Sequence, residues 1–264
     1  MNTTTRTGRI LLRVWVALVL ILLFLPILIV IVYAFNKSNV QRWPIPGFST
    51  KWFSVAWHDH AVRSSLILSV KAGLIATAIA LVLGSLAAFG VHRFRFFGRE
   101  TVSFLLVLPL ALPGIITGIA LNSAFHFAGI DLSLLTIVVG HATFCIVVVY
   151  NNVIARLRQT SGSMIEASMD LGARPWQTFR FVTLPTLSTA LVSGGLLAFA
   201  LSFDEVIVTT FTAGAQNTLP LWIFGALRLG QQLPEVNVVI LFVLAVTIIP
   251  VAASSRLMSR GGIR

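Results

Sequence analysis

The chain has 264 residues, of which 57% are hydrophobic and only 10% are charged, and its formal net charge is +11. A soluble domain usually carries about 25% charged residues and could not cover so much apolar surface. A disordered chain has low hydrophobicity, so that class is excluded too. The single cysteine, Cys145, excludes an intramolecular disulfide and a multi-cysteine metal site. We therefore expect an all-α integral membrane protein.

Long apolar runs predict where the chain crosses the membrane. A bilayer core about 30 Å thick needs about 20 apolar residues in a helix. Six runs meet this requirement, at residues 14–35, 64–91, 102–122, 132–154, 184–203 and 236–258. The first run is too long for a signal peptide and lacks a cleavage site, so we interpret it as an uncleaved helix. Residues 219–229 are too short to span and are interpreted as interfacial or re-entrant.

The basic residues are unevenly distributed among the predicted loops, which indicates the orientation of the chain. If residues 1–13 are cytoplasmic, thirteen arginines share that side: Arg6, Arg9, Arg13, Arg93, Arg95, Arg99, Arg156, Arg158, Arg174, Arg180, Arg256, Arg260 and Arg264. The outer side then holds five basic residues: Lys37, Arg42, Lys51, Arg63 and Arg228. Lys71, near the outer end of the second helix, can extend its ammonium to the headgroups. This bias predicts six spans with both termini cytoplasmic and a periplasmic loop at residues 36–63.

The loop between the fourth and fifth predicted helices has the pattern of two short helices joined by a turn. Ser163 and Glu166 match a capping box that would begin the first helix. Gly172 is placed to end it in a left-handed conformation, and Pro175 suits the first turn of a second helix. Several apolar side chains of this loop are expected to be covered by a partner: Met164, Ile165, Leu171, Trp176 and Phe179.

This loop resembles the EAA loop of the permease subunits of bacterial ABC importers, whose pattern is E-A-A-x3-G-x9-I-x-L-P. The matching residues are Glu166, Ala167, Gly172, Leu184 and Pro185. Ser168 replaces the second alanine and Val182 the isoleucine, which are mild departures. In that family the loop, here residues 163–185, docks into a cleft on the ATPase. The resemblance therefore implies an ATPase-coupling role for Glu166, Ala167, Asp170, Gly172 and Pro185.

Further segments resemble the spermidine/putrescine permeases of the PotC type, with the YdcV-like branch most similar. They are residues 140–145, 200–214, 218–224 and 234–237. The resemblance implies a type I (MetI-like) ABC transmembrane domain at residues 63–255 in the bacterial inner membrane. It also implies a second homologous permease subunit, two ATPase subunits and a periplasmic substrate-binding protein, and no nucleic-acid partner.

Candidate residues of the substrate path begin in the third predicted helix. Pro113 and Gly114 interrupt its hydrogen-bond ladder at a depth where irregular backbone is tolerated only against protein or a water-filled cavity. Broken helices of this kind mark translocation sites in other transporters, although a kink for packing is the alternative. Related spermidine permeases carry an acid at the position of Gly114, and that departure weakens the prediction of polyamine recognition here. Asn122, at the end of the helix, is a weaker candidate.

Other candidates lie on the outer side. Asp204 and Glu205 end the fifth predicted helix and would neutralise a passing cation, with Asp131 and Glu235 extending an acidic vestibule. Alternatively they are solvated ends of a span or contacts with a neighbouring subunit. Trp52 in the outer loop is interpreted as an interfacial anchor, with cation–π contact to an ammonium substrate or contact with a binding protein as alternatives.

No motif for chemistry is recognised. There is no phosphate-binding G-x-x-x-x-G-K-[ST] loop, no catalytic constellation and no expected cofactor, and the pairs His58/His60 and His141/Cys145 are too sparse to predict a metal site. The sequence thus predicts the permease subunit of an ATP-driven importer for a small cation such as putrescine or spermidine. Import of another small solute, such as an opine-like amine or a phosphonate, is an alternative. An ion-gradient-driven carrier is a third interpretation.

Overall fold

The computed structural model describes residues 6–94, 96–230 and 232–246. The second half of the predicted helix at 236–258, three of the cytoplasmic arginines (Arg256, Arg260 and Arg264) and the end of the predicted domain at 255 lie outside this part of the chain. So does Arg95. The chain forms two compact units, one of residues 64–222 and the other from the segments on either side of it. Each is described by itself.

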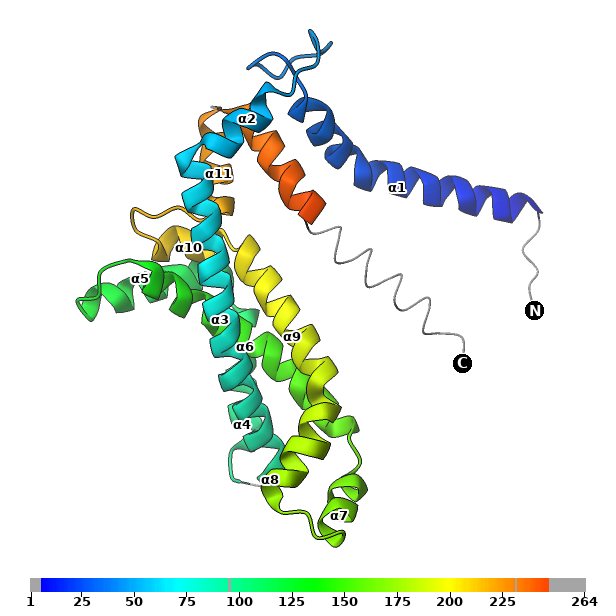
Figure 1. Cartoon of the computed structure of the whole chain (residues 1–264), viewed down its shortest axis with the longest axis vertical. Helices are drawn as coiled ribbons and strands as arrows, with labels where there is room; N and C mark the ends of the chain where they lie inside the picture. Colours follow the sequence, from blue (N-terminus) through cyan, green and yellow to red (C-terminus); the bar gives the residue numbers. More distant parts are fainter. Residues whose placement is uncertain (1–5, 95, 231, 247–264) are drawn as a thin grey trace. The chain divides into compact units, whose positions relative to one another are not determined.

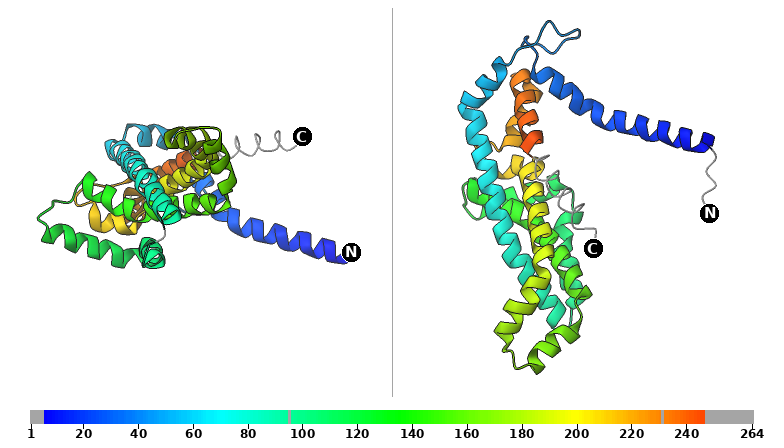
Figure 2. Two further views of the ribbon diagram at one scale, coloured as in Figure 1. Left: turned by 90° about the horizontal axis from the view of Figure 1, so that it is seen from below. Right: turned by 45° about the vertical axis from the view of Figure 1, so that its right-hand side comes forward.

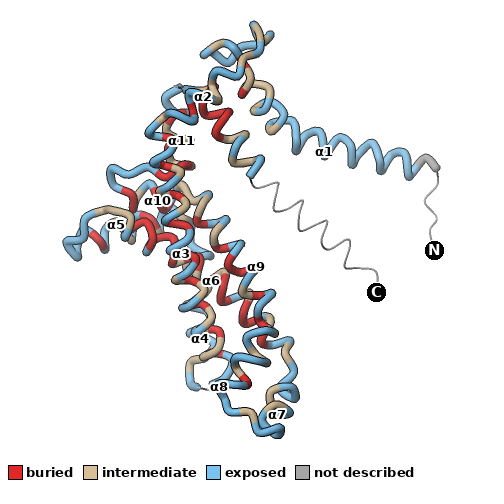
Figure 3. The backbone as a smooth tube through the Cα atoms, viewed as in Figure 1, coloured by how far each residue is buried: buried red, intermediate tan, exposed pale blue. Residues whose placement is uncertain are grey.

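Three long helices form the main body of the first unit. They are α3 (His60–Arg93), α6 (Leu134–Gln159) and α9 (Leu184–Asp204), which run side by side in Figures 1 and 2. Helix α6 is the most deeply buried of the three, as its red tube in Figure 3 indicates. Small residues permit the close approach of the helices: a Cβ on Gly84 of α3 would lie 2.8 Å from the Ile146 carbonyl of α6. Such residues are typical of membrane helix interfaces.

The third predicted helix is broken in the structure. Helix α4 (Arg99–Ala111) and helix α5 (Gly114–Phe127) meet at an angle of 102°. The break falls at Leu112 and Pro113, because proline removes a backbone donor and disfavours the helical conformation of the residue before it. A second interruption separates α9 from the short helix α10 (Ile207–Thr212), which packs against α5 and α6.

One end of this unit carries the loop that follows α6. Helix α7 (Gly162–Asp170) is followed by a turn, by helix α8 (Pro175–Thr178) and by a π-helical turn, η1 (Phe179–Thr183). Helices α8 and α9 and the π turn form one helical run from Pro175 to Asp204. The predicted second short helix is present and begins at Pro175, but it continues without a break into α9.

The second unit contains α1 (Arg6–Ala34), α2 (Lys51–His58) and an apolar helix at Leu233–Val246. Helix α1 is exposed along most of its length (Figure 3). Helix α11 (Leu219–Leu229) begins in the first unit and continues into the second. Between α1 and α2, Phe53 packs on Phe35, with ring centroids 5.1 Å apart.

Within the described residues, four helices are long and apolar enough to cross a membrane, and the bent α4–α5 pair raises the number to five. The prediction of an all-α membrane protein is confirmed. Helix α11, with 11 residues, is too short to span, as predicted. The described part of the sixth predicted span lies in the apolar helix Leu233–Val246, which is also shorter than a membrane crossing.

Candidate functional site

The start of α7 differs from the prediction. Its N-cap is Ser161, whose Oγ accepts a hydrogen bond from the Ser163 backbone N–H at 3.3 Å, and the helix begins at Gly162. The expectation that Ser163 caps the helix together with Glu166 is wrong by two residues, because the chain has serines at both positions and the earlier one takes the role. Glu166 then lies in the middle of α7 with its side chain exposed.

The end of α7 confirms the predicted role of Gly172 in the turn. Gly172 has a φ of +83°, and its N–H donates to the Met169 carbonyl at 2.8 Å. The next N–H, of Ala173, donates to the Ser168 carbonyl at 3.1 Å. These two bonds form a Schellman motif, which satisfies the last carbonyls of the helix. Two hydroxyl groups, Ser168 Oγ and Thr178 Oγ1, lie 3.0 Å apart and tie α7 to α8 across this turn.

The helical run after the turn begins as predicted at Pro175. The Arg174 N–H donates to Gln177 Oε1 at 2.7 Å and thereby caps its first turn. The π turn lies just before Pro185, which has no N–H to donate to the preceding turn. Single π turns of this kind occur at functional positions in helices. Because the run is continuous, a force applied to α7 and α8 acts directly on α9.

The outward surface of this loop is uncovered in the single chain. Glu166, Ala167, Asp170 and Pro185 are exposed. So are large apolar side chains: Leu171 is 89% exposed and Trp176 is 66% exposed. Phe179, by contrast, is half-buried between Phe89 of α3 and Trp176. We call the exposed surface of α7 and α8 the coupling surface. It combines apolar side chains with two carboxylates, which suits an apolar cleft with basic groups nearby.

The broken helix α5 packs closely on α10. Gly118 lies beneath Phe211, because a Cβ at this glycine would be 2.6 Å from the Phe211 ring. Asn122 Nδ2 donates to the Phe211 carbonyl at 2.6 Å. Gly114 begins α5, and a Cβ there would lie 3.5 Å from the Ile207 side chain. The structure therefore brings Gly114 and Asn122 together with the segment that follows Glu205, although 89 residues separate Asn122 from Phe211.

Asp204 and Glu205 have different surroundings. Asp204 is the last residue of α9 and is exposed. Glu205 is half-buried, and its Oε1 accepts the Val208 N–H at 2.8 Å, which caps the first turn of α10. A carboxylate at a helix N-terminus is stabilised by the free N–H groups and the helix dipole. Glu205 thus caps a helix within this chain, a structural role that was not predicted.

A buried histidine connects three helices at this point. His141 of α6 is 1% exposed, with Nδ1 2.7 Å from Ser202 Oγ of α9 and Nε2 2.8 Å from Thr209 Oγ1 of α10. The Thr209 hydroxyl donates to the Glu205 carbonyl at 2.7 Å, so it accepts from His141. Nε2 therefore donates to Thr209, while Nδ1 and the Ser202 hydroxyl form the second hydrogen bond of the ring. From the sequence, His141 was considered only together with Cys145, as a pair too sparse for a metal site. No sequence pattern predicted these contacts between three helices.

Trp52 lies in the second unit, at the start of α2, and is held by the loop between α1 and α2. Its Nε1 donates to the Asn36 carbonyl at 2.9 Å, and Lys51 Nζ is 4.3 Å from the centre of the ring. One face of the indole is therefore already in contact with a cation of the same chain. Within the described residues, no group of three or more metal-ligating side chains is found.

The fold matches transmembrane subunits of ABC transporters. One is a bacterial ABC transporter involved in the import of the acidic polysaccharide alginate, with a TM-score of 0.70 and 17% identity, covering 98% of this chain and 99% of that one. Another is the inward-facing methionine transporter MetNI, with a TM-score of 0.60 and 18% identity, covering 81% of this chain and 99% of that one. These similarities confirm the predicted class of fold.

Residues 80–260 match the family of binding-protein-dependent transport system inner membrane components, and the chain belongs to this family. It is 38% identical over 224 residues to the putrescine transport system permease PotI of Escherichia coli, covering 81% of this chain and 79% of that protein. It is 33% identical over 249 residues to the spermidine/putrescine permease PotC of the same species, covering 94% and 93%. The PotC protein of Haemophilus influenzae is 34% identical over 217 residues, covering 81% and 83%.

Family membership defines the general role of the chain. It is a multi-pass permease of the inner membrane and is not itself an enzyme. A binding-protein-dependent system also implies an ATPase and a binding protein as partners. The predicted family is thus confirmed.

Proposed function

We propose that this chain is the permease subunit of an ATP-driven importer for a polyamine such as putrescine or spermidine. The observation that carries the proposal is the 33% identity to a spermidine/putrescine permease over 94% of the chain, together with 38% identity to a putrescine permease. A polyamine is a flexible cation, and the predicted outer side of this chain carries most of its few acidic residues. Phosphonates are anions, so this distribution favours a cationic cargo over that alternative.

The proposed topology has six spans with both termini in the cytoplasm. The distribution of arginines supports it. This orientation places the coupling surface on the cytoplasmic side, where an ATPase would meet it. The exposed α1 supports the presence of neighbouring protein or lipid along its length. We propose a second homologous permease subunit, two ATPase subunits and a periplasmic binding protein as the full complex.

The coupling surface is the proposed docking site of the ATPase. The Schellman turn at Gly172 fixes the angle between α7 and α8, and the run from Pro175 to Asp204 leads from that turn into the membrane. Closure of the ATPase dimer would therefore displace α9 at one end. At the other end α9 meets α10, which packs on the broken α5. In this mechanism the movement reaches the breaks at Pro113 and Glu205 by direct contacts.

The proposed substrate path follows those breaks. Asp204 is exposed at the end of α9 and is available to a cation, and the broken backbone at Pro113 lies in the helix that packs on α10. Trp52 stays a candidate for the outer entrance, where a cationic substrate would compete with Lys51 for the face of its ring. Asn122 and Glu205 use part of their hydrogen-bonding capacity within the chain, so we propose that they shape the path and leave the direct contact to Asp204.

The test is uptake by the reconstituted complex in proteoliposomes. Radiolabelled putrescine and spermidine are supplied with the binding protein, with ATP enclosed on the ATPase side. We expect uptake that requires ATP, survives collapse of the proton gradient and is reduced by either unlabelled polyamine. Competition only by an opine-like amine or a phosphonate would contradict the proposed cargo. Uptake that continues without the ATPase and stops with the proton gradient would favour the ion-driven carrier instead.

Arginine at Glu166 tests the docking site directly. We expect Glu166→Arg to release the ATPase from the purified complex, because it reverses one of the two charges of the coupling surface. The matched control is Glu100→Arg, a change of an exposed acid at the start of α4. An ATPase that stays bound in the first variant, as it does in the control, would contradict the docking role.

A further inference from the structure

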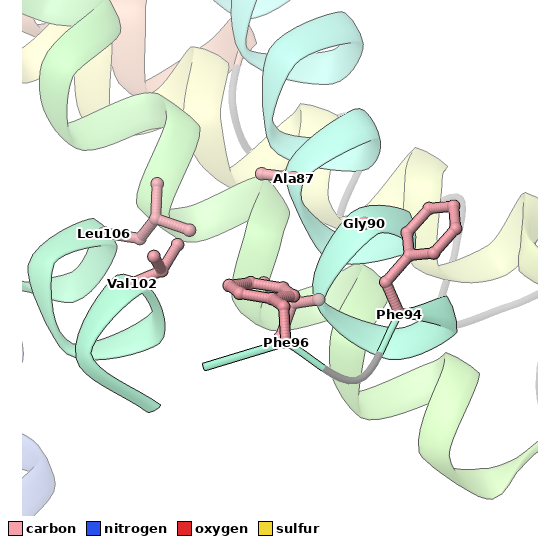
Figure 4. Close-up of a pocket in the computed structure, with 7 residues that line it drawn as sticks. Ala87, Gly90, Phe94, Phe96, Val102 and Leu106 are labelled. Carbon is pink, nitrogen blue, oxygen red and sulfur yellow. The ribbon is translucent and has the colours of Figure 1, made fainter. Parts of the chain in front are cut away.

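An apolar cavity of about 390 Å³ lies between the end of α3 and the start of α4. Figure 4 shows its lining, which comes from both helices and from the loop that joins them. The lining residues are Ala87, Gly90, Val91, Phe94, Phe96, Val102 and Leu106. At Gly90 a Cβ would meet no atom within 4 Å, so this glycine opens onto free space. Phe94 and Phe96, at 64% and 43% exposed, are large apolar side chains at the rim.

The two helices that line the cavity carry arginines at the ends that face their connecting loop. Arg93 is the last residue of α3 and is exposed, and Arg99 is the first residue of α4 and is half-buried. Both lie at the ends of helices that extend away from the loop into the apolar part of the chain. In the orientation proposed above, this is the cytoplasmic edge of the membrane. An apolar cavity between helix ends that carry arginines suits a phospholipid, because anionic lipids concentrate on this leaflet and arginine pairs with phosphate.

We propose that the cavity binds one anionic phospholipid, with an acyl chain against Gly90 and Leu106 and the phosphate group near Arg93 and Arg99. This inference rests on the proposed orientation of the chain. A peptide segment fits less well, because its N–H and C=O groups would find no polar partner among the lining side chains. An acyl chain has no polar groups to satisfy. A zwitterionic lipid would fill the cavity but would gain less from the two arginines.

The position of the cavity connects it to the coupling surface. Phe89, one residue before Gly90, packs edge-on against Phe179 of the π turn, with centroids 5.9 Å apart. On the other wall, Tyr150 of α6 donates its hydroxyl proton to Ser103 Oγ of α4 at 3.0 Å. A lipid between these walls would fix the spacing of α3 and α4 and so the support of Phe179. We therefore expect the bound lipid to affect the coupling of ATP hydrolysis to uptake.

The test is native mass spectrometry of the purified complex, with phosphatidylglycerol and phosphatidylcholine titrated separately. We expect the wild type to retain one phosphatidylglycerol molecule at least tenfold more tightly than phosphatidylcholine. Gly90→Leu fills the cavity and should abolish this retention. The double variant Arg93→Gln/Arg99→Gln should remove the preference for the anionic lipid while leaving weak binding of both.

Two controls separate the proposed site from general effects. Gly90→Ala keeps most of the cavity and favours the helix, so its complex should fold and should retain phosphatidylglycerol. Arg158→Gln removes an exposed arginine at the end of α6 and should leave the preference unchanged. Lipid retention is measured without transport. A result that contradicts the lipid site can therefore be distinguished from a result that contradicts the proposed polyamine cargo.

Three outcomes would overturn the inference. One is equal retention of the two lipids by the wild type, and another is unchanged retention in Gly90→Leu. The third is disulfide capture of Leu106→Cys by a cysteine of the second permease subunit, because the cavity would then be an interface between subunits. If uptake is measured in parallel, Gly90→Leu should hydrolyse more ATP for each polyamine imported than Gly90→Ala does.

Discussion

Phe89 of α3 and Phe179 of the π turn lie edge to face, with ring centroids 5.9 Å apart and ring planes inclined by 62°. Phe179 belongs to the helical run that starts at the coupling surface, and Phe89 belongs to a different membrane helix. The pair therefore gives this helical run a contact with a second helix, close to the coupling surface. Since Phe179 also stacks on Trp176 at 5.5 Å, it connects the exposed coupling surface to α3.

Removal of this pair should uncouple ATP hydrolysis from uptake. Aromatic pairs of this geometry contribute about 0.5–1.5 kcal/mol beyond the area that they bury. We expect Phe89→Ala and Phe179→Ala each to lower the ratio of polyamine imported to ATP hydrolysed, and the double variant to be little worse than either. Phe203→Ala, at an aromatic pair within α9, serves as the control. Additive losses in the double variant would show that the two rings act independently.

Gly172→Ala should weaken the turn at the coupling surface. The φ of +83° costs a residue with a Cβ about 1–2 kcal/mol, whereas no atom within 4 Å would collide with that Cβ. The energetic penalty is therefore purely conformational. Gly172→Asn should destabilise the turn less than Gly172→Ala, because asparagine adopts the left-handed conformation more readily. We expect faster hydrogen exchange in α7 and reduced ATPase binding.

Gly162→Ala is the matched control for this change. Gly162 also has open space around a Cβ, but it begins α7 and does not have a positive φ. Alanine there should leave exchange in α7 unchanged or slower. If both alanine variants lose ATPase binding to the same extent, the left-handed turn is not the cause.

Gly118→Ala should destabilise the contact between α5 and α10. The added Cβ would lie 2.6 Å from Phe211 Cδ2, which is closer than atoms pack, so the Phe211 ring or α10 must shift. Overpacking of this kind typically costs about 1–3 kcal/mol, which should lower the melting temperature of the complex. Gly114→Ala is the control, because its Cβ would make an ordinary 3.5 Å contact. The double variant Gly118→Ala/Phe211→Leu should regain most of the lost melting temperature. If it does not, the contact with Phe211 is not the cause of the defect.

The sequence predicted the local features of the coupling loop more completely than the contacts around the broken helix. Gly172 and Pro175 could be assigned because a helix end and a helix start depend on neighbouring residues alone. The N-cap of α7 could not be assigned in this way. Ser161 and Ser163 are chemically identical side chains, and only the direction of the incoming chain selects between them. The 102° bend at Pro113 was indicated as a break, but its angle depends on the packing of α10. The His141 junction joins residues more than sixty positions apart, and no local pattern indicates such a contact.

Glu235 should make the stability of the complex depend on pH. It lies in the first turn of the helix at Leu233–Val246, before the predicted start of the sixth span, and it is 2% exposed. Burial, then the charge of Asp59 and a hydrogen bond with it, raise the pKa of Glu235 from 4.5 to about 7. Its Oε1 has no hydrogen-bond partner among the described residues. The folded protein therefore favours the protonated carboxyl group, which also donates a hydrogen bond.

The sign of the effect follows from proton linkage. Because the folded-state pKa is higher than the unfolded value, the stabilisation by protonation is complete below about pH 4.5 and is lost as the pH rises through about 7. Glu235→Gln keeps the shape of the side chain and stays neutral at every pH. Its melting temperature should match that of the wild type at low pH and exceed it above about pH 7, by an amount equivalent to at most about 3 kcal/mol. Asp59→Asn should shift the wild-type loss of stability to lower pH, because the charge of Asp59 and its hydrogen bond both raise the pKa of Glu235. A difference between wild type and Glu235→Gln that is constant from about pH 5 to about pH 8 would show that Glu235 does not titrate in this range.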